Sequence, residues 1–435
     1  MLAVLRRFPQ FRKLWLAQAV SQAGDWLNHI AVLALIGQLS GAAGALGMGA
    51  LFGVELALRL LPTAFFGPLA GPLADRLPRR AMMIVSDLVR AGIVVCLLMV
   101  DEPGELPLLF ALVLMQMSLG IFFDAARAGA LPNTVDRESL HAAYALSAAT
   151  WSATLALGAF LGGVALRHLG LAGVFLLDAA SYLVSAAFLA RLELPATPRQ
   201  DEPFSWRNVL LATELRWAWG HLASVGALPV VWAKWFWGVA GGYLVLLSIA
   251  ANVRFGTGPA PSGSGLDPDA LASAGLAVGV LYCARGVGTG LGPILTRWWL
   301  SGADASLLVQ TGASFLVAAA GYALLGFAGQ LWVAFLCVTL AHMGGSTLWV
   351  SSTTLWQRRV SDAFRGRVHA LEFLGTTLAF STGGVLAGLV YDATAAFELT
   401  LWGTCAATVL SGALWWRTAR RLLGTWAAGA GAGAA

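Results

Sequence analysis

Charged side chains are scarce in this sequence, at 11% of 435 residues. A soluble protein of this length needs a charged surface, and the chain has too few such residues to build one. Apolar runs recur along nearly the whole length, and most exceed the roughly 20 residues that cross a bilayer. Because the runs are continuously apolar rather than alternating, they argue against a β-barrel. The sequence therefore predicts an all-α polytopic membrane protein.

Several catalytic signatures are also missing. No GxxxxGK[ST] stretch is present, which disfavours ATP-driven pumping by this chain. No Ser/His/Asp or HExxH pattern supports an enzyme. The cysteines stand singly inside apolar runs, so we expect small core residues and neither a metal site nor a redox pair: Cys96, Cys283, Cys337 and Cys405. We predict no enzyme activity, no cofactor and no metal.

Helical spans long enough to cross a membrane can be placed along the chain. We predict twelve of them, near residues 14–38, 48–73, 81–100, 107–130, 141–166, 172–191, 227–250, 271–296, 305–327, 331–355, 368–391 and 397–416. The first six form an N-terminal bundle (1–192), followed by a polar, partly amphipathic cytoplasmic linker (193–226). The last six form a C-terminal bundle (227–418), and the Gly/Ala-rich tail (419–435) is predicted to be a disordered cytoplasmic segment.

The basic residues indicate topology rather than nucleic-acid binding, despite a net charge of +5. If the N-terminus is cytoplasmic, nearly all Lys and Arg of the connections lie on that side, and Arg167 and Arg254 lie on the other. An even number of spans places both termini inside. We therefore expect a multi-pass protein of the plasma membrane that contacts the lipid bilayer and binds no nucleic acid.

An internal repeat divides the chain near its middle. GPLADR (71–76) reappears as GPILTR (292–297), and 135–163 aligns with 360–388 at a similar offset. Parallel six-helix repeats are the plan of transporters that rock two halves about a midplane site. We expect two six-helix pseudo-repeats around a central cavity.

The sequence resembles the major facilitator superfamily in the loop that follows the second span. Gly71, Asp75, Arg76, Arg79 and Arg80 match the family's signature loop, although Pro78 stands where the family usually has Gly. The stretches FRKLWLAQAVSQAGDWL (11–27), SDLVRAG (86–92), ALPNTV (130–135) and RGRV (365–368) are similar to siderophore and macrolide exporters. Helix 5 departs from the family's antiporter motif GPxxGG, because Ala159 replaces the Pro.

The signature loop is a candidate cytoplasmic gate. By resemblance, Asp75 would pair with Arg127 and with the start of helix 11 near Arg367, closing one face of the transporter in one state. The alternative is that the bases only fix topology. The gate set is Gly71, Asp75, Arg76, Arg79, Arg80, Arg127 and Arg367. Pairs of small residues four apart permit close helix packing, static or moving: Gly158, Gly162, Gly163, Gly288, Gly292, Gly384 and Gly388.

Ionisable residues inside the spans are candidates for a proton or substrate pathway, because such groups are expensive in a membrane. Asp25 lies about 16 Å into helix 1, at about 1.5 Å per residue, and Asn28 and His29 share its face. Glu55 and Arg59 form either a functional pair or a self-neutralising one. Asp87 with Arg90, and Asp124 with Arg127, are expected to be structural pairs.

The second half carries bases without an acid three or four residues away. Lys234 and Arg285 invite an anionic substrate or a cross-domain acid, from the other half of the chain. His342 is either titratable near neutral pH or a hydrogen-bonded structural residue. Asp178 and Glu372 are expected to be packing or gate groups.

Together these features predict a monomeric secondary active transporter. The leading interpretation is a proton-coupled exporter of a small amphipathic compound, such as a drug, siderophore or secondary metabolite, by alternating access. A lysolipid or lipid flippase and an uptake carrier share this architecture. A non-transporting membrane scaffold or sensor is the alternative from another class.

Overall fold

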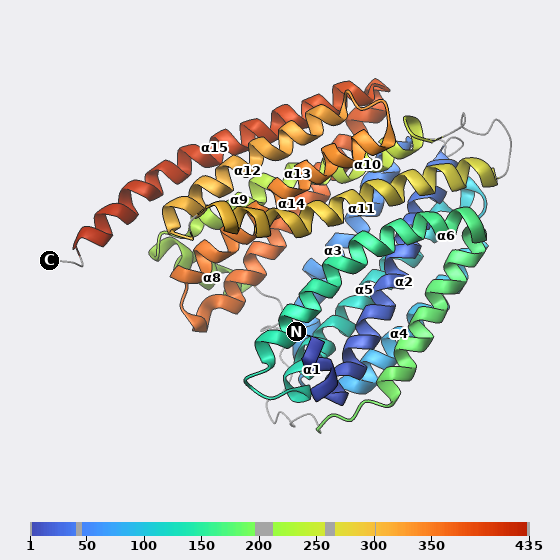
Figure 1. Ribbon diagram of the computed structural model, residues 1–435, viewed down its shortest axis with the longest axis horizontal. Helices are drawn as coiled ribbons and strands as arrows, with labels where there is room; N and C mark the ends of the chain where they lie inside the picture. The colour runs from blue at the N-terminus through green and yellow to red at the C-terminus, as the bar shows by residue number, and fades with distance from the viewer. Residues whose placement is uncertain (1, 41–45, 196–211, 257–265, 301, 433–435) are drawn as a thin grey trace. The chain divides into compact units, whose positions relative to one another are not determined.

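The computed structural model describes residues 2–40, 46–195, 212–256, 266–300 and 302–432 (Figure 1). This part of the chain is helical and contains no strand. The helices before residue 195 are α1 (Leu2–Arg7), α2 (Pro9–Leu39), α3 (Met48–Ala74), α4 (Arg79–Cys96), η2 (Leu97–Met99), η3 (Pro103–Glu105), α5 (Leu106–Ala130), η4 (Leu131–Thr134) and α6 (Leu140–Ala190). The later helices are α8 (Ala212–Ser224), α9 (Leu228–Phe236), η5 (Trp237–Val239), α10 (Ala240–Val253), α11 (Pro268–Trp299), α12 (Asp304–Leu325), α13 (Leu331–Arg359), α14 (Asp362–Thr394) and α15 (Phe397–Ala432).

Ten helical stretches among the described residues are long and apolar enough to cross a membrane. One of them, α6, has 51 residues and contains Gly170 at φ 67, a conformation that interrupts a helix. Figure 1 shows α6 changing direction along its length, in teal and then green. With α6 counted twice and the 31-residue α2 added, the helices agree with the twelve predicted spans. The all-α membrane fold is confirmed.

Two compact units can be distinguished. Unit 1 comprises Met1–Val209 and Leu247–Cys283, and unit 2 comprises Leu210–Leu246 and Ala284–Ala435. The chain is divided between the units at 209/210, within the predicted linker (193–226), and again within α10 and within α11. The last part of α10 and the first part of α11 belong to unit 1. The division into six-helix halves remains a prediction.

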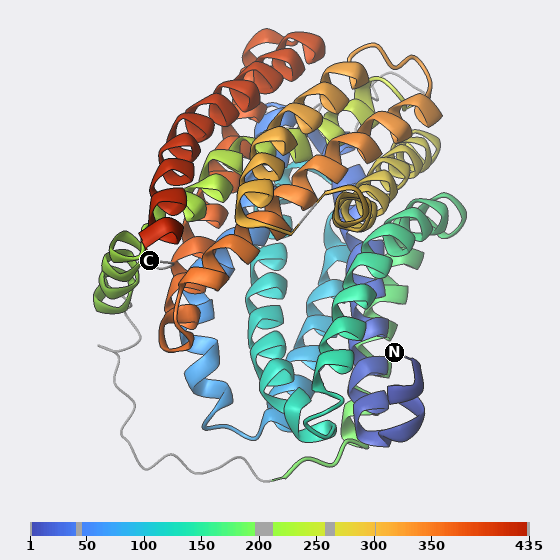
Figure 2. The same cartoon turned by 60° about the vertical axis from the view of Figure 1, so that its left-hand side comes forward.

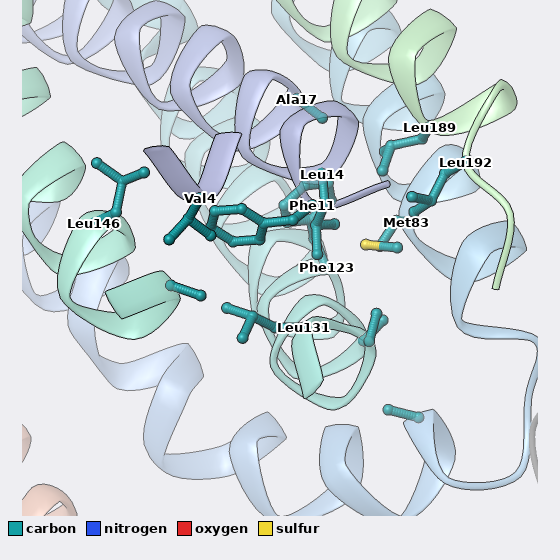
Figure 3. Close-up of a cluster of buried hydrophobic side chains, with 14 residues drawn as sticks. Val4, Phe11, Leu14, Ala17, Met83, Phe123, Leu131, Leu146, Leu189 and Leu192 are labelled. Atoms are coloured by element: carbon teal, nitrogen blue, oxygen red, sulfur yellow. The ribbon is translucent and has the colours of Figure 1, made fainter. Parts of the chain in front are cut away.

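Within unit 1, α2 packs along α6, and α5 lies against α3 and α4 (Figure 1). A cluster of buried apolar side chains joins α1, α2, α4, α5, η4 and α6 (Figure 3). Phe11 and Leu14 of α2 point into it, together with Met83, Phe123 and Leu189. This cluster fixes the ends of the helices whose middles carry polar groups.

Within unit 2, α12 lies along α13 and α15 (Figure 2). The structure corrects one expectation here. Helix α15 continues to Ala432, so the predicted disorder of the tail is wrong for 419–432. Alanine favours helix more than any other residue, and it is frequent in this stretch. Part of the predicted linker (193–226), residues 196–211, lies outside the described residues. Residues 212–224 of the linker form α8.

Candidate functional site

The polar middle of α2 contacts three other helices, α6, α3 and α11. Asn28 Nδ2 donates to Asp178 Oδ2 of α6 at 2.7 Å. His29 Nδ1 lies 3.2 Å from Glu55 Oε1 of α3, and its ring meets Tyr282 of α11 edge-on at 5.3 Å between centroids. Asn28 and His29 are neighbours in sequence, so they point to different sides of α2. The predicted pathway residues of helix 1 are therefore brought against α6, α3 and α11.

Asp25 is the most accessible carboxyl group of this region. Its side chain is 28% exposed, and Arg90 Nη1 lies 3.8 Å from its Oδ2. The Tyr182 hydroxyl of α6 donates a hydrogen bond to the other carboxylate oxygen, Oδ1. Gln116 of α5 in turn donates to the Tyr182 oxygen at 3.0 Å. Asp25 is thus held by α6 and α4 but remains open on one side.

Arg90 of α4 lies closer to Asp87 than to Asp25. Its Nη2 donates to Asp87 Oδ1 at 2.5 Å, and both side chains are almost fully buried. Ser185 Oγ completes the environment of Asp87 with a donated bond of 2.6 Å to Oδ2. The guanidinium also lies over the Tyr182 ring, 4.3 Å from its centroid. The expected pairing of Asp87 with Arg90 is present, but it belongs to a larger network.

We call this network the unit 1 charge cluster, made of Asp25, Asn28, Asp87, Arg90, Asp178 and Tyr182. It contains three carboxyl groups and one guanidinium. A buried surplus of negative charge is costly in a membrane, and a proton is the simplest way to neutralise it. The cluster is therefore suited to binding and releasing protons.

Glu55 and Arg59 form a second, balanced pair in the same unit. Arg59 Nε donates to Glu55 Oε1 from the next turn of α3. Arg59 Nη1 also reaches Met117 Sδ of α5 at 3.6 Å. Of the two interpretations left open by the sequence, this geometry favours the self-neutralising pair.

Unit 2 contains one buried ion pair in which each charge has a partner. Lys234 Nζ of α9 lies 2.9 Å from Glu372 Oε1 of α14, and both side chains are at most 2% exposed. Thr353 Oγ1 accepts a further bond from Lys234 at 2.7 Å. Trp356 Nε1 donates to Glu372 Oε1 at 2.9 Å. Lys234 was predicted to meet an anionic substrate or a cross-domain acid. Its partner Glu372, 138 positions away, lies in the same unit and the same predicted half, so this ion pair forms within one half of the chain.

His342 takes part in an aromatic stack of unit 2. Its Nε2 lies 2.7 Å from the Tyr322 hydroxyl. The Tyr322 ring stacks on Tyr243 with centroids 3.8 Å apart. This environment favours the structural interpretation of His342. Arg285 of α11 lies near enough to act electrostatically on His342.

The predicted gate loop is tied to unit 1 by its bases. Asp75 pairs with Arg79, with 3.0 Å between Oδ1 and Nη2. Arg79 also donates to two main-chain carbonyl groups, those of Ala74 at 3.0 Å and Gly129 at 2.5 Å. Arg80 donates to the carbonyl oxygen of Ala190. These bases bind the last carbonyl groups of α3, α5 and α6, which is a favourable place for a cation.

The other predicted gate residues are each described in their own unit. Arg127 Nη2 lies 3.3 Å from Asp124, and its Nη1 donates to Gln18 of α2 at 3.0 Å. In this structure Asp75 pairs with Arg79, one turn away, and the pairing of Asp75 with Arg127 stays a prediction. Arg367 belongs to unit 2, where it lies over the Phe364 ring at 5.5 Å. A Cβ built at Gly71 would meet nothing within 4 Å, and Arg76 precedes α4.

The loop 135–139, between η4 and α6, is charged and lies outside the predicted membrane spans. Asp136, between η4 and α6, pairs with Arg7 at 2.8 Å. Hydrogen bonds from Ser139 and the charge of Arg7 lower the pKa of Asp136.

The predicted packing glycines mostly face helices of their own unit. A Cβ at Gly158 would lie 2.9 Å from Trp26 Cβ, and one at Gly162 would lie 3.0 Å from Leu27 Cα, so both admit α2. Gly163 faces Gly275 of α11. Gly288 and Gly292 face α13 next to Thr339 and Met343, and Gly384 approaches α10 near Gly241. Gly388 lies in α14.

Three residues of the unit 1 charge cluster contact Asp25 or Asn28, although the sequence did not predict them as pathway residues. Asp178 and Tyr182 were not placed in the pathway, and Arg90 was assigned to a local pair. The available signal was spacing: Asp178, Tyr182 and Ser185 recur at helical intervals in an apolar run. Among the described residues no group of three His, Cys, Asp or Glu side chains is placed to hold a metal ion.

Comparison with known proteins identifies the family. The profile described as "Major Facilitator Superfamily" matches residues 14–303. The chain belongs to this superfamily. In fold it is similar to a variant of the nucleoside transporter NupG, with a TM-score of 0.71, 13% identity, and coverage of 94% of this chain and 99% of that one.

Curated relatives match over different lengths. The putative bacilysin exporter BacE of Bacillus subtilis strain 168 is 32% identical over 34% of this chain and 36% of its own length. Macrolide efflux protein A of Streptococcus pyogenes is 33% identical over 30% and 31%. Thus the chain matches about a third of the length of these relatives. The uncharacterized transporter Rv0037c of Mycobacterium tuberculosis is 28% identical over 85% of this chain and 82% of its own.

Proposed function

We propose that this transporter is a proton-coupled exporter of a small amphipathic compound. The two predicted halves, 1–192 and 227–418, would alternate around a central cavity. The names of BacE and macrolide efflux protein A support the outward direction. The predominance of basic residues in one set of connections supports a plasma-membrane protein with both termini in the cytoplasm. We further propose that it acts as a monomer.

One observation carries the proton coupling: the partly exposed carboxyl group of Asp25 borders a buried region with more acids than bases. Arg90 lies 3.8 Å from Asp25 but 2.5 Å from Asp87, so its charge is divided. A proton or a cationic cargo that reaches Asp25 would relieve the surplus of negative charge. Competition between the two for one site is the physical basis of exchange.

Flux in inverted membrane vesicles tests this function. Wild-type vesicles are given a panel of a macrolide, a dipeptide antibiotic, a siderophore and a lipophilic cation, with and without an imposed proton gradient. We expect gradient-driven accumulation of at least one compound, and loss of about tenfold or more in Asp25→Asn. Glu138→Gln changes an exposed acid outside the spans and is the control. Accumulation that ignores both the gradient and Asp25→Asn would disprove proton coupling at this site.

A second proposal concerns the gate. The Asp75–Arg79 pair holds the end of α3 beside the end of α5, and we propose that it opens and closes during transport. Asp75→Asn should lower flux severely while membrane insertion, measured by the amount of protein in the membrane fraction, stays normal. Unchanged flux in Asp75→Asn would leave the pair with a topological role alone.

A further inference from the structure

Asp178, in the second half of α6, is a carboxyl group whose partners carry no charge. It is fully buried. Its donors are Asn28 Nδ2 at 2.7 Å and Ser181 Oγ at 3.3 Å. It forms no ion pair within the described part of the chain. A carboxylate sealed in this way keeps an uncompensated charge unless it takes up a proton.

The Asn28 amide fits Asp178 in either protonation state. Its NH₂ group donates to Asp178, while its buried Oδ1 has no hydrogen-bond partner in the described structure. An amide has a donor end and an acceptor end of nearly the same shape, and its orientation follows the hydrogen bonds around it. If Asp178 were protonated, a half-turn of the amide would let Oδ1 accept the proton of the acid. The unpartnered oxygen is therefore an acceptor already in place.

Two hydrogen bonds on successive turns join α2 to α6, and one involves Asp25 while the other involves Asp178. Asp25 bonds Tyr182, and one turn further along α2 Asn28 bonds Asp178. The numbering rises on α2 and falls on α6, so the two helices are antiparallel here. Gly24 permits this approach: a Cβ there would lie 2.8 Å from Ser181 Cβ and would collide with the Asp178 carboxyl group.

The two acids differ in their access to water. Asp25 is 28% exposed, whereas Asp178 is sealed. They are close enough to repel each other electrostatically, and Arg90 acts on both. Asp87 of α4 also faces this region and is paired with Arg90. Two further charged groups, Arg59 of α3 and Asp124 of α5, act on Asp25. Because the carboxylates repel each other, a proton on one makes the charge on the other easier to hold.

We propose that Asp178 is the carboxyl group that stores a proton, that Asp25 exchanges this proton with water, and that the Asn28 amide turns as Asp178 is loaded and unloaded. The inference rests on the proton coupling proposed above. In the transfer, the O–H bond at Asp178 breaks and one forms at Asp25, so the cluster keeps its net charge. Release from Asp25 to water completes the step.

Infrared spectroscopy of the purified full-length protein in lipid nanodiscs tests the storage site without any cargo. Difference spectra between pH values, in water and in heavy water, report the C=O stretch of a protonated carboxyl group. We expect a band in the wild type at neutral pH that shifts in heavy water, is lost in Asp178→Asn, and is kept in Asp25→Asn. A wild type without such a band would overturn the proposal. So would a band lost in Asp25→Asn but kept in Asp178→Asn.

A second variant tests the role of the amide. In Asn28→Ala the band should remain but move to higher wavenumber, because the carboxyl group has lost a hydrogen bond. An unmoved band would exclude Asn28 as its partner. If Asp178→Asn fails to fold, Asp178→Glu provides the same test, since a longer acid should move the band rather than remove it.

These results can be separated from the proposed function. If the band behaves as expected but vesicle flux ignores the proton gradient, the storage site stands and proton-driven export fails. If flux follows the gradient but the band does not depend on Asp178, export stands and another acid carries the proton.

Discussion

Unit 2 holds a buried lysine against a buried glutamate, whereas unit 1 holds one buried arginine against three aspartates. Around the Lys234–Glu372 pair, a threonine hydroxyl and a tryptophan N–H add further hydrogen bonds, while Glu372 Oε2 has no hydrogen-bond partner among the described residues. Around Arg90, the acids include Asp178, which has only neutral donors. A balanced pair compensates both of its buried charges, while an unbalanced cluster holds negative charge that a proton would neutralise. The difference suggests that unit 2 is built for specificity of packing and unit 1 for titration.

Removing the acid from the balanced pair should have the largest effect on stability. Glu372→Gln removes the negative charge beside Lys234, so the buried ammonium group keeps only neutral neighbours: the new amide, Thr353 and the Trp349 ring. We expect a loss of about 3–5 kcal/mol in the free energy of unfolding. Thermal unfolding in detergent measures the loss. The double variant Glu372→Leu with Lys234→Met removes both charges and should be far closer to wild type. If the single and double variants were equally unstable, the loss would come from packing and not from the stranded charge.

Removing the base from the unbalanced cluster should destabilise the protein in a way that depends on pH. Arg90→Met leaves three carboxyl groups without a cation, so we expect a loss of about 2–4 kcal/mol near neutral pH. Because these groups can take up protons, stability should recover as the pH falls. Unfolding midpoints across a pH series, compared with wild type, report this recovery. A deficit of constant size at every pH would contradict the idea of a titrating cluster.

Two tyrosine variants form a matched pair with a smaller effect. Tyr182→Phe removes the donor to Asp25 in unit 1, and Tyr322→Phe removes the hydroxyl that meets His342 in unit 2. Each should cost about 1–2 kcal/mol of stability. Only Tyr182→Phe should alter the pH profile of gradient-driven flux in vesicles. Equal pH profiles in the two variants would remove the functional distinction between the units.

Removing the arginines that bind main-chain carbonyl groups near the helix ends should have the smallest effect on the free energy of unfolding. In unit 1, Arg79 binds the carbonyl group of Gly129. In unit 2, Arg358 binds the carbonyl group of Gly302 at 2.7 Å and Asp304 at 2.8 Å. Arg358 is more exposed than Arg79, at 46% against 16% of the side chain. We therefore expect Arg79→Ala to cost about 1 kcal/mol and Arg358→Ala about half as much. Thermal unfolding compares them, and the reverse order would be inconsistent with the observed burial.

The sequence by itself determined the membrane class, the helix positions and the family. Apolar runs longer than a bilayer's thickness have few alternatives, since only a helix satisfies the backbone within one segment. Proximity along a helix also predicted the local pairs Glu55–Arg59 and Asp87–Arg90, whose spacing brings them to one face.

Only the tertiary structure decided which distant groups meet. Glu372 lies 138 positions from Lys234, and Asp178 lies 150 positions from Asn28. Helical periodicity says which face of a helix a residue occupies but not which helix packs against that face. Whether a buried charge is compensated depends on those neighbours. For that reason the sequence could indicate costly polar groups, while the fold alone distinguished the balanced pair from the cluster with more acids than bases.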